Sequence, residues 1–184
     1  MMKKLMILAA IALTLTACGN KNNANTEKEG DNADNNTETA APKWKTYTNE
    51  KHGFSMEVPA GLTQRETMLP EDGTIFSDDG AEGITFNRID ITGHKSIFDE
   101  EYTPEKVREE FEDWTGPLSE DIDAKECGDN YFTYSIKGNM VNELHKHMYK
   151  GTEMVAVVII YEPDNEDKLG GVVAEHVFNS IKFK

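Results

Sequence analysis

The chain of 184 residues is poor in cysteine. It has two, Cys18 and Cys127, and no Cys-x-x-Cys pair, which excludes a structural zinc site built from cysteines. If Cys18 is consumed by a modification, Cys127 has no partner for a disulfide within the chain. The stability of a folded domain must then come from a hydrophobic core.

Lysine and arginine are also scarce relative to acid, since 19 basic residues stand against 34 acidic ones and the formal net charge is −15. A surface that binds nucleic acid needs clustered Lys and Arg against phosphate, so this composition argues against a nucleic-acid partner. The charge instead favours solubility and suits a cationic partner.

The short motifs of common catalytic sites are missing as well. There is no Gly-x-Ser-x-Gly, no His-Glu-x-x-His, no phosphate-binding Walker loop and no Gly-x-Gly-x-x-Gly. Cys127 lacks a local activating pattern, and acidic pairs such as Asp78-Asp79 fit turns and solvated faces. We therefore expect a protein that is not an enzyme and uses no cofactor, with a hydrolase as the least favoured alternative.

The N-terminus has the pattern of a secretory signal. Lys3 and Lys4 precede a largely apolar run from Leu5 to Leu15 that is too short for a stable membrane span, and Thr-Ala then leads to Cys18. This arrangement resembles the lipobox of bacterial lipoprotein precursors. The resemblance implies that residues 1–17 are removed and that Cys18 carries acyl chains of the palmitate type as the first mature residue. The alternative is an ordinary cleaved signal that leaves Cys18 free.

An acylated Cys18 implies attachment to a membrane of the bacterial cell envelope without crossing it. The next residue is Gly19 and not the aspartate that resembles an inner-membrane retention signal, so the outer membrane is favoured if the host has two membranes. Residues 18–42 are rich in Asn, Thr, Glu and Ala and lack large apolar side chains, which predicts a disordered tether. Residues 43–184 have a length typical of one domain.

Short strands and two helices are expected in this domain. Met154–Tyr161 is apolar at nearly every position, which predicts a central strand covered on both faces. Thr103-Pro104 is a typical helix start, and Val107, Phe111 and Trp114 follow on one stripe that we expect to face the core. The other expected strands are Trp44–Tyr47, Phe54–Val58, Thr74–Phe76, Ile84–Ile91 with a bulge near Arg88, Phe132–Ile136, Val141–Lys150 and Ile181–Phe183.

The second helix is expected from about Asp164 to Phe178. Its inward residues should be Leu169, Val172, Val173 and Val177. Gly170-Gly171 inside this helix costs about 1 kcal/mol per glycine relative to alanine, and close approach to the sheet is the expected reason. Together these elements predict an α+β domain with a mostly antiparallel sheet flanked by helices.

Three short motifs in this order of elements resemble the PsbP-like superfamily, especially its small bacterial lipoproteins. They are Tyr47–Gly61, with the pattern y.n..hGFs.evPag, then Tyr161-Glu162-Pro163, and finally Asn179–Phe183. Many relatives end the first motif in Pro-x-x-Trp, whereas this chain has Leu62. The resemblance implies a single α/β/α sandwich domain and an accessory or binding role, and it implies no functional residue.

Glu143, His145 and His147 form the most specific candidate site. Alternate residues of a strand share a face, so these three could offer two imidazoles and a carboxylate to Zn²⁺ or Cu²⁺. The alternative is a solvated strand face opposite Leu144 and Met148, because one strand seldom supplies a complete ligand set.

Acidic residues concentrate from Asp99 to Asp123, where eleven carboxylates stand against two cations. If the apolar stripe of the first helix faces the core, then Glu105, Glu109 and Glu112 point outward. We expect this face to meet a basic envelope protein or a cationic small ligand, the alternative being a merely solvated helix face. The sequence thus predicts a membrane-anchored binding or accessory module that is not catalytic, with metal or small-ligand binding through His145 and His147 as the alternative.

Overall fold

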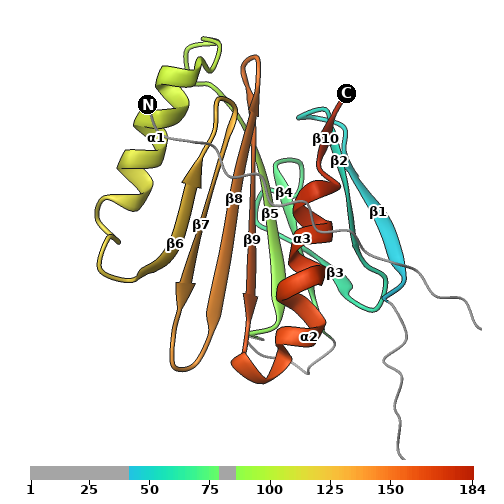
Figure 1. Ribbon diagram of the computed structural model, residues 1–184. Helices are drawn as coiled ribbons and strands as arrows, with labels where there is room; N and C mark the ends of the chain where they lie inside the picture. Colours follow the sequence, from blue (N-terminus) through green and yellow to red (C-terminus); the bar gives the residue numbers. More distant parts are fainter. Residues whose placement is uncertain (1–41, 79–85) are drawn as a thin grey trace, which may run out of the picture. The chain divides into compact units, whose positions relative to one another are not determined.

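The computed structural model describes residues 42–78 and 86–184, and within them the strands form two antiparallel sheets (Figure 1). The expected signal, Cys18 and nearly all of the expected tether lie outside the described residues. The smaller sheet has the order β1-β2-β10, with β1 Trp44–Asn49, β2 Phe54–Pro59 and β10 Lys182–Phe183. The larger sheet has the order β3-β4-β5-β9-β8-β7-β6, with β3 Thr63–Glu66, β4 Gly73–Ser77, β5 Arg88–Lys95, β9 Glu153–Tyr161, β8 Asn142–Lys150, β7 Tyr131–Lys137 and β6 Ile122–Cys127.

The helices of this part of the chain are α1 Pro104–Thr115, α2 Glu166–Leu169 and α3 Gly171–Asn179, and a 3₁₀ turn at Pro163–Asn165 precedes α2. The expected start of the first helix is confirmed, since the Thr103 side chain accepts a hydrogen bond from the backbone N–H of Lys106. Among the described residues, no helix combines the length and apolar composition that a membrane crossing requires.

The central position of β9 is confirmed. It is the fourth of the seven strands in the larger sheet and pairs with β5 and β8. Its odd-numbered residues, from Val155 to Tyr161, are buried in one hydrophobic cluster with Leu169 and Val177 of the C-terminal helices. On its other face, Met154 belongs to a second cluster that lies under α1.

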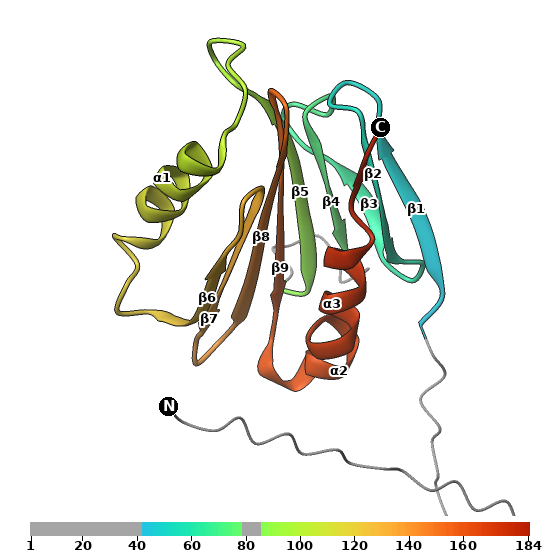
Figure 2. The same cartoon turned by 45° about the horizontal axis from the view of Figure 1, so that its top comes forward.

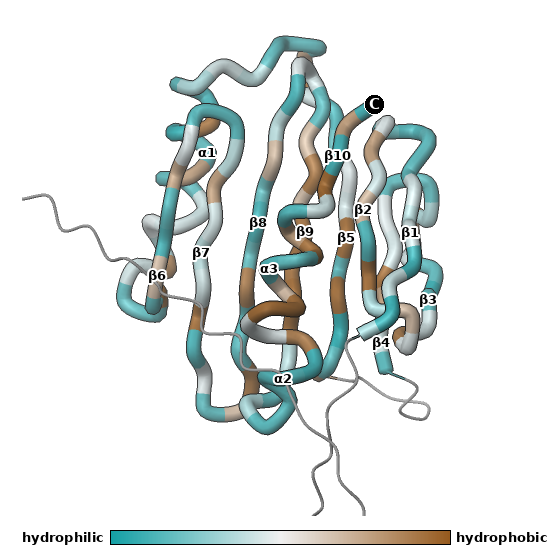
Figure 3. Tube along the Cα trace, turned by 45° about the vertical axis from the view of Figure 1, so that its right-hand side comes forward, coloured by the Kyte–Doolittle hydropathy of each residue, from teal (hydrophilic) through white to brown (hydrophobic). Residues whose placement is uncertain are grey.

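The two faces of the larger sheet are covered by different elements. Figure 2 shows β6 to β9 running between α1 on one side and α2 with α3 on the other. The small β1-β2-β10 sheet packs on the α3 side, where Phe54, Met56 and Val58 of β2 join the cluster around β9. In Figures 1 and 3, α2 and α3 lie over the middle of the sheet, and no helix covers the same face of β7 and β6.

Two edge strands were not expected from the sequence. The strands β3 and β6 are polar and almost wholly exposed, because each has a neighbour on one side only and little cover on its faces. Their residues therefore lack the apolar alternation that marks a strand. The bulge expected near Arg88 is wrong: β5 begins at that residue and continues in regular register with β9 to Lys95. The preceding residues 84–85 lie outside the described residues.

The expected C-terminal helix is broken into two. Gly170 lies between α2 and α3, and Gly171, the first residue of α3, has a φ of +44°, a conformation that favours glycine. The break turns Val172 outward, where 83% of its surface is exposed, so the expectation that it packs inward is wrong. Trp114 is also not a core residue, because it lies near the end of α1 and is 47% exposed.

We predict that Ile159→Ala lowers the free energy of unfolding by about 2 to 5 kcal/mol, because it leaves a cavity beneath α2 and α3. Val172→Ala is the matched control and should change the free energy of unfolding by no more than about 0.5 kcal/mol, since Val172 is on the surface. Urea denaturation measures both. Equal effects of the two substitutions would contradict the packing described for β9.

Candidate functional site

A groove of about 910 Å³ lies on the α3 side of the larger sheet, over β6, β7 and β8. Residues of β7 and β8 form its floor, among them Thr133, Ser135 and Leu144. One wall is a stripe of α3 whose members are spaced by three or four residues, namely Gly171, Ala174, Glu175 and Phe178. The volume is within the range of small-molecule sites in proteins.

Lys146 of β8 lies on the floor of this groove. Its ammonium lies over the ring of Tyr131 at 5.5 Å and over the ring of Phe178 at 5.9 Å, so it is held between aromatic faces from β7 and α3. Partial burial lowers the pKa of this ammonium, an effect that the charge of Glu126 opposes. Within residues 42–78 and 86–184, no carboxylate forms an ion pair with Lys146.

Three carboxylates around the groove already have partners. The pairs are Glu126 with the Tyr131 hydroxyl at 2.6 Å, Asp123 with the Lys137 ammonium at 2.9 Å, and Glu166 with the Tyr161 hydroxyl. The second pair raises the pKa of Lys137, whereas burial, with a smaller contribution from Glu166, raises the pKa of Tyr161 to about 12. Among the described residues, three lysines line the groove. Lys137 is paired with Asp123 and the Lys125 ammonium lies over Phe111 of α1, whereas the Lys146 ammonium lies over rings that belong to the groove itself.

This groove could not be found from the sequence, because its described residues come from six separate elements, β6, β7, β8, β9, α2 and α3. One local signal was present. Lys146 lies between Leu144 and Met148 on a strand face that was recognised as apolar, and a lysine at such a position must either reach solvent or find a partner. The arrangement offers aromatic and aliphatic surface, hydroxyls such as those of Thr133 and Ser135, and the Lys146 ammonium, which suits binding better than bond-making chemistry.

The side chains of the histidines singled out from the sequence stack on the cluster under α1, on the opposite strand face, although His145 is also among the residues that line the groove. Glu143 and His145 contact each other, with 2.9 Å between Oε2 and Nε2, and the His145 ring stacks on Tyr134 at 4.2 Å. Burial lowers the pKa of His145, and the contact with Glu143 partly offsets this. Among the residues that the structure describes, no three His, Cys, Asp or Glu side chains are placed to hold a metal ion. Metal binding at Glu143, His145 and His147 stays a prediction.

His147 is a core residue of this face and not a solvated one. It is 2% exposed and stacks on Phe132 at 4.4 Å, while Trp114 of α1 lies 5.1 Å from it. Burial, with smaller contributions from His145 and His94, lowers its pKa to about 3, so the ring is neutral at physiological pH. Such a neutral ring contributes aromatic surface to the cluster that holds α1.

The acidic face of α1 is exposed, as expected. Glu105, Glu109 and Glu112 are all on the surface of the helix. The pKa of Glu105 is lowered by its own backbone N–H and by the Thr103 hydroxyl, so this carboxylate also serves the start of the helix. Docking of a basic partner on them stays a prediction.

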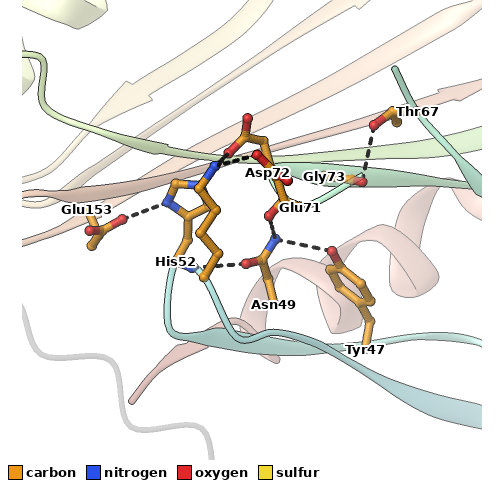
Figure 4. A network of polar contacts seen from close by, with 9 residues as sticks. Tyr47, Asn49, His52, Thr67, Glu71, Asp72, Gly73 and Glu153 are labelled. Atoms are coloured by element: carbon orange, nitrogen blue, oxygen red, sulfur yellow. Dashed lines mark hydrogen bonds and ion pairs between the residues drawn. The ribbon is translucent and has the colours of Figure 1, made fainter. Parts of the chain in front are cut away.

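A network around His52 has the residue types of a catalytic site but lies in the joint between the two sheets (Figure 4). The His52 Nδ1 atom is 2.8 Å from Glu153 Oε2, and its Nε2 atom is 2.9 Å from Asp72 Oδ1. Gly93 lies beneath the ring, where a Cβ would be 2.6 Å from it. Both ring nitrogens are occupied and the residue is 5% exposed, so the network joins the β1-β2 turn to the ends of β4 and β9.

Cys127 ends β6 and is partly buried. Burial raises the pKa of its thiol, and its sulfur contacts the backbone carbonyl of Gly128 at 3.6 Å. A raised pKa keeps the thiol protonated at neutral pH, which is unfavourable for a nucleophile.

The order of strands and the cover of the sheet define a PsbP-like α+β fold of a single domain with a seven-stranded antiparallel sheet. The solution structure of cyanobacterial PsbP (CyanoP) from Synechocystis sp. PCC 6803 has this fold. It matches with a TM-score of 0.54 and 14% identity over 80% of this chain and 96% of that one. No protein-family model and no curated protein sequence matches the chain.

Two further solved structures show the same kind of likeness. A crystal structure of a protein from Bacteroides thetaiotaomicron VPI-5482 matches with a TM-score of 0.52 and 12% identity, over 76% of this chain and 48% of that one. The Saccharomyces cerevisiae Ran-binding protein Mog1p matches with a TM-score of 0.47 and 11% identity, over 78% of this chain and 96% of that one. At these identities the likeness concerns the fold alone.

Proposed function

We propose that this chain is a lipid-anchored protein of the bacterial envelope whose folded domain is a binding module and not an enzyme. The observation that carries the binding role is the groove on the α3 side, which joins apolar floor and wall to a lysine without a carboxylate partner. The lipobox-like sequence that ends at Cys18 supports the anchor and the envelope location.

The absence of convergent catalytic groups in the groove supports a binding role over catalysis. An acyl-transfer or hydrolytic site needs a nucleophile, a base within hydrogen-bond reach of it and donors for an oxyanion. Of the four acids in the described lining of the groove, Asp123, Glu126 and Glu166 are engaged by tyrosine or lysine side chains. A tethered domain of this kind would hold a ligand, or deliver it, close to the membrane surface.

The anchor predicts that Cys18→Ala releases the protein from the membrane fraction and removes the mass of the acyl chains. Those chains hold a protein on a bilayer because each buried methylene contributes about 0.8 kcal/mol. Cys127→Ala is the control and should leave both the mass of the modification and the membrane location unchanged. Fractionation with intact-mass spectrometry measures both, and a Cys18→Ala variant that stays acylated in the membrane would refute the anchor.

The binding role predicts that the groove takes up a neutral aromatic probe, N-phenyl-1-naphthylamine, whose fluorescence rises in apolar surroundings. The measurement uses the unlipidated chain from Gly19 to Lys184, which retains every residue that the structure describes. Thr133→Trp places a large ring on the floor of the groove and should abolish saturable uptake. Thr63→Trp puts the same ring on the exposed edge strand β3 and should leave uptake intact. Equal uptake by both variants would contradict the assignment of the groove.

A further inference from the structure

We propose that the groove binds an amphiphilic monoanion, a molecule with an aromatic or branched apolar body and one carboxylate-type head group, and that this head group contacts the Lys146 ammonium. The inference rests on the proposed function of the groove as a binding surface. It adds the chemical class of the ligand and the residue that recognises it.

Among the residues that the structure describes, the Lys146 ammonium lacks the polar partners that a partly buried charge needs. It is partly withdrawn from water, yet in the described part of the chain it has two aromatic rings around it and no ion pair. Cation–π contacts offset only part of the hydration free energy that such an ammonium loses on burial. A bound oxyanion would complete its coordination with a charge-assisted hydrogen bond, which is among the stronger polar contacts in proteins.

The apolar side chains around this ammonium determine the shape and polarity of the ligand's body. Phe178 and Ala174 of α3 and Leu144 of β8 present apolar surface on one side, and the Tyr131 ring does so on the other. Aromatic rings favour stacked or edge-on contacts with another ring, so a flat or branched apolar body fits between them. The hydroxyls of Thr133 and Ser135 lie on the same strand face and supply polar contacts beside the head group.

The charges at the rim limit the head group to a single negative charge. Glu126, Glu166 and Glu175 surround the groove, and they would repel a dianion such as a phosphate monoester more than a monoanion. A cationic ligand would avoid that repulsion but would face the Lys146 ammonium on the floor. A monoanion avoids both kinds of repulsion. Its negative head group contacts the Lys146 ammonium, and its apolar body keeps that head group away from the carboxylates at the rim.

The test compares two probes that share one aromatic body. 8-Anilinonaphthalene-1-sulfonate carries a single sulfonate, and N-phenyl-1-naphthylamine is the same ring system without it. Both are titrated by fluorescence against the unlipidated chain from Gly19 to Lys184 and three variants. Lys146→Met keeps the aliphatic stem and removes the charge, Lys146→Arg keeps a charge, and Lys45→Met is the matched control. The Lys45 ammonium also lies over an aromatic ring, that of Phe76 at 5.0 Å, and Lys45 is not among the residues that line the groove.

We expect the sulfonate probe to bind more tightly than the neutral one, and Lys146→Met to weaken it by about tenfold while changing the neutral probe by less than about twofold. Lys146→Arg should restore most of the affinity for the sulfonate probe. Lys45→Met should alter neither probe, because it removes a charge from a residue that does not line the groove.

The remaining outcomes separate the inference from the proposed function. If the neutral probe binds and the sulfonate probe binds no more tightly, or if Lys146→Met weakens both probes equally, the inference is overturned and the groove remains a binding surface. An unchanged affinity of the sulfonate probe in Lys146→Met likewise overturns it. If neither probe binds the unsubstituted chain, the proposed function and the inference both fail.

Discussion

Burial of β9 on both faces is the constraint on which the rest of the domain depends. The strand is apolar at nearly every position. The helices α2 and α3 with the β1-β2-β10 sheet cover one face along its length, and on the other face Met154 and Ala156 at its start belong to the cluster that includes α1. On the first side this cover is centred on β9 and on its neighbour β5. It ends before β7 and β6, and the face left open there becomes the groove (Figure 3).

The same constraint explains why Lys146 has unusual surroundings. Its two neighbours on the strand face, Leu144 and Met148, pack against the cluster around β9, so the lysine emerges at the border between covered and open sheet. Phe178 closes one side of it as part of α3, and Tyr131 closes the other from β7. The side chain is therefore close enough to the core to lose hydration and close enough to the groove to meet a ligand.

The sequence predicted the parts of the fold that are set by apolar periodicity and by helix-end chemistry. The central strand, the β1-β2 hairpin and the start of α1 at Thr103 follow from local patterns that the structure retains. The strands β3 and β6 could not be predicted in this way, because edge strands bury little and their side chains are free to be polar. Trp114 and Val172 were misplaced for a related reason, since the end of α1 and the break at Gly171 depend on tertiary contacts.

For the candidate site, the sequence pointed to β8, the strand that also lines the groove, but to the side chains of its other face. Its pattern placed His145 and His147 together, and they do share a face, but that face is covered by α1. The groove uses the alternate residues of the same strand and needs α3, which is distant in sequence, to form its wall. Which face of a strand stays open depends on the lengths and positions of the covering elements, and no local pattern records it.

The central claim is that Lys146 is a partly dehydrated ammonium in an open groove, and the pH dependence of lysine acylation tests it most directly. Competitive labelling with trace acetic anhydride, followed by peptide mass spectrometry, gives the pKa of each lysine in the intact protein. Lys137 lines the same groove and is the internal reference, because its ion pair with Asp123 raises its pKa whereas burial lowers that of Lys146. As the pH rises, Lys146 should become reactive before Lys137, since a lowered pKa gives the neutral amine at lower pH. Titration of Lys146 at or above the pKa of Lys137 would contradict the account.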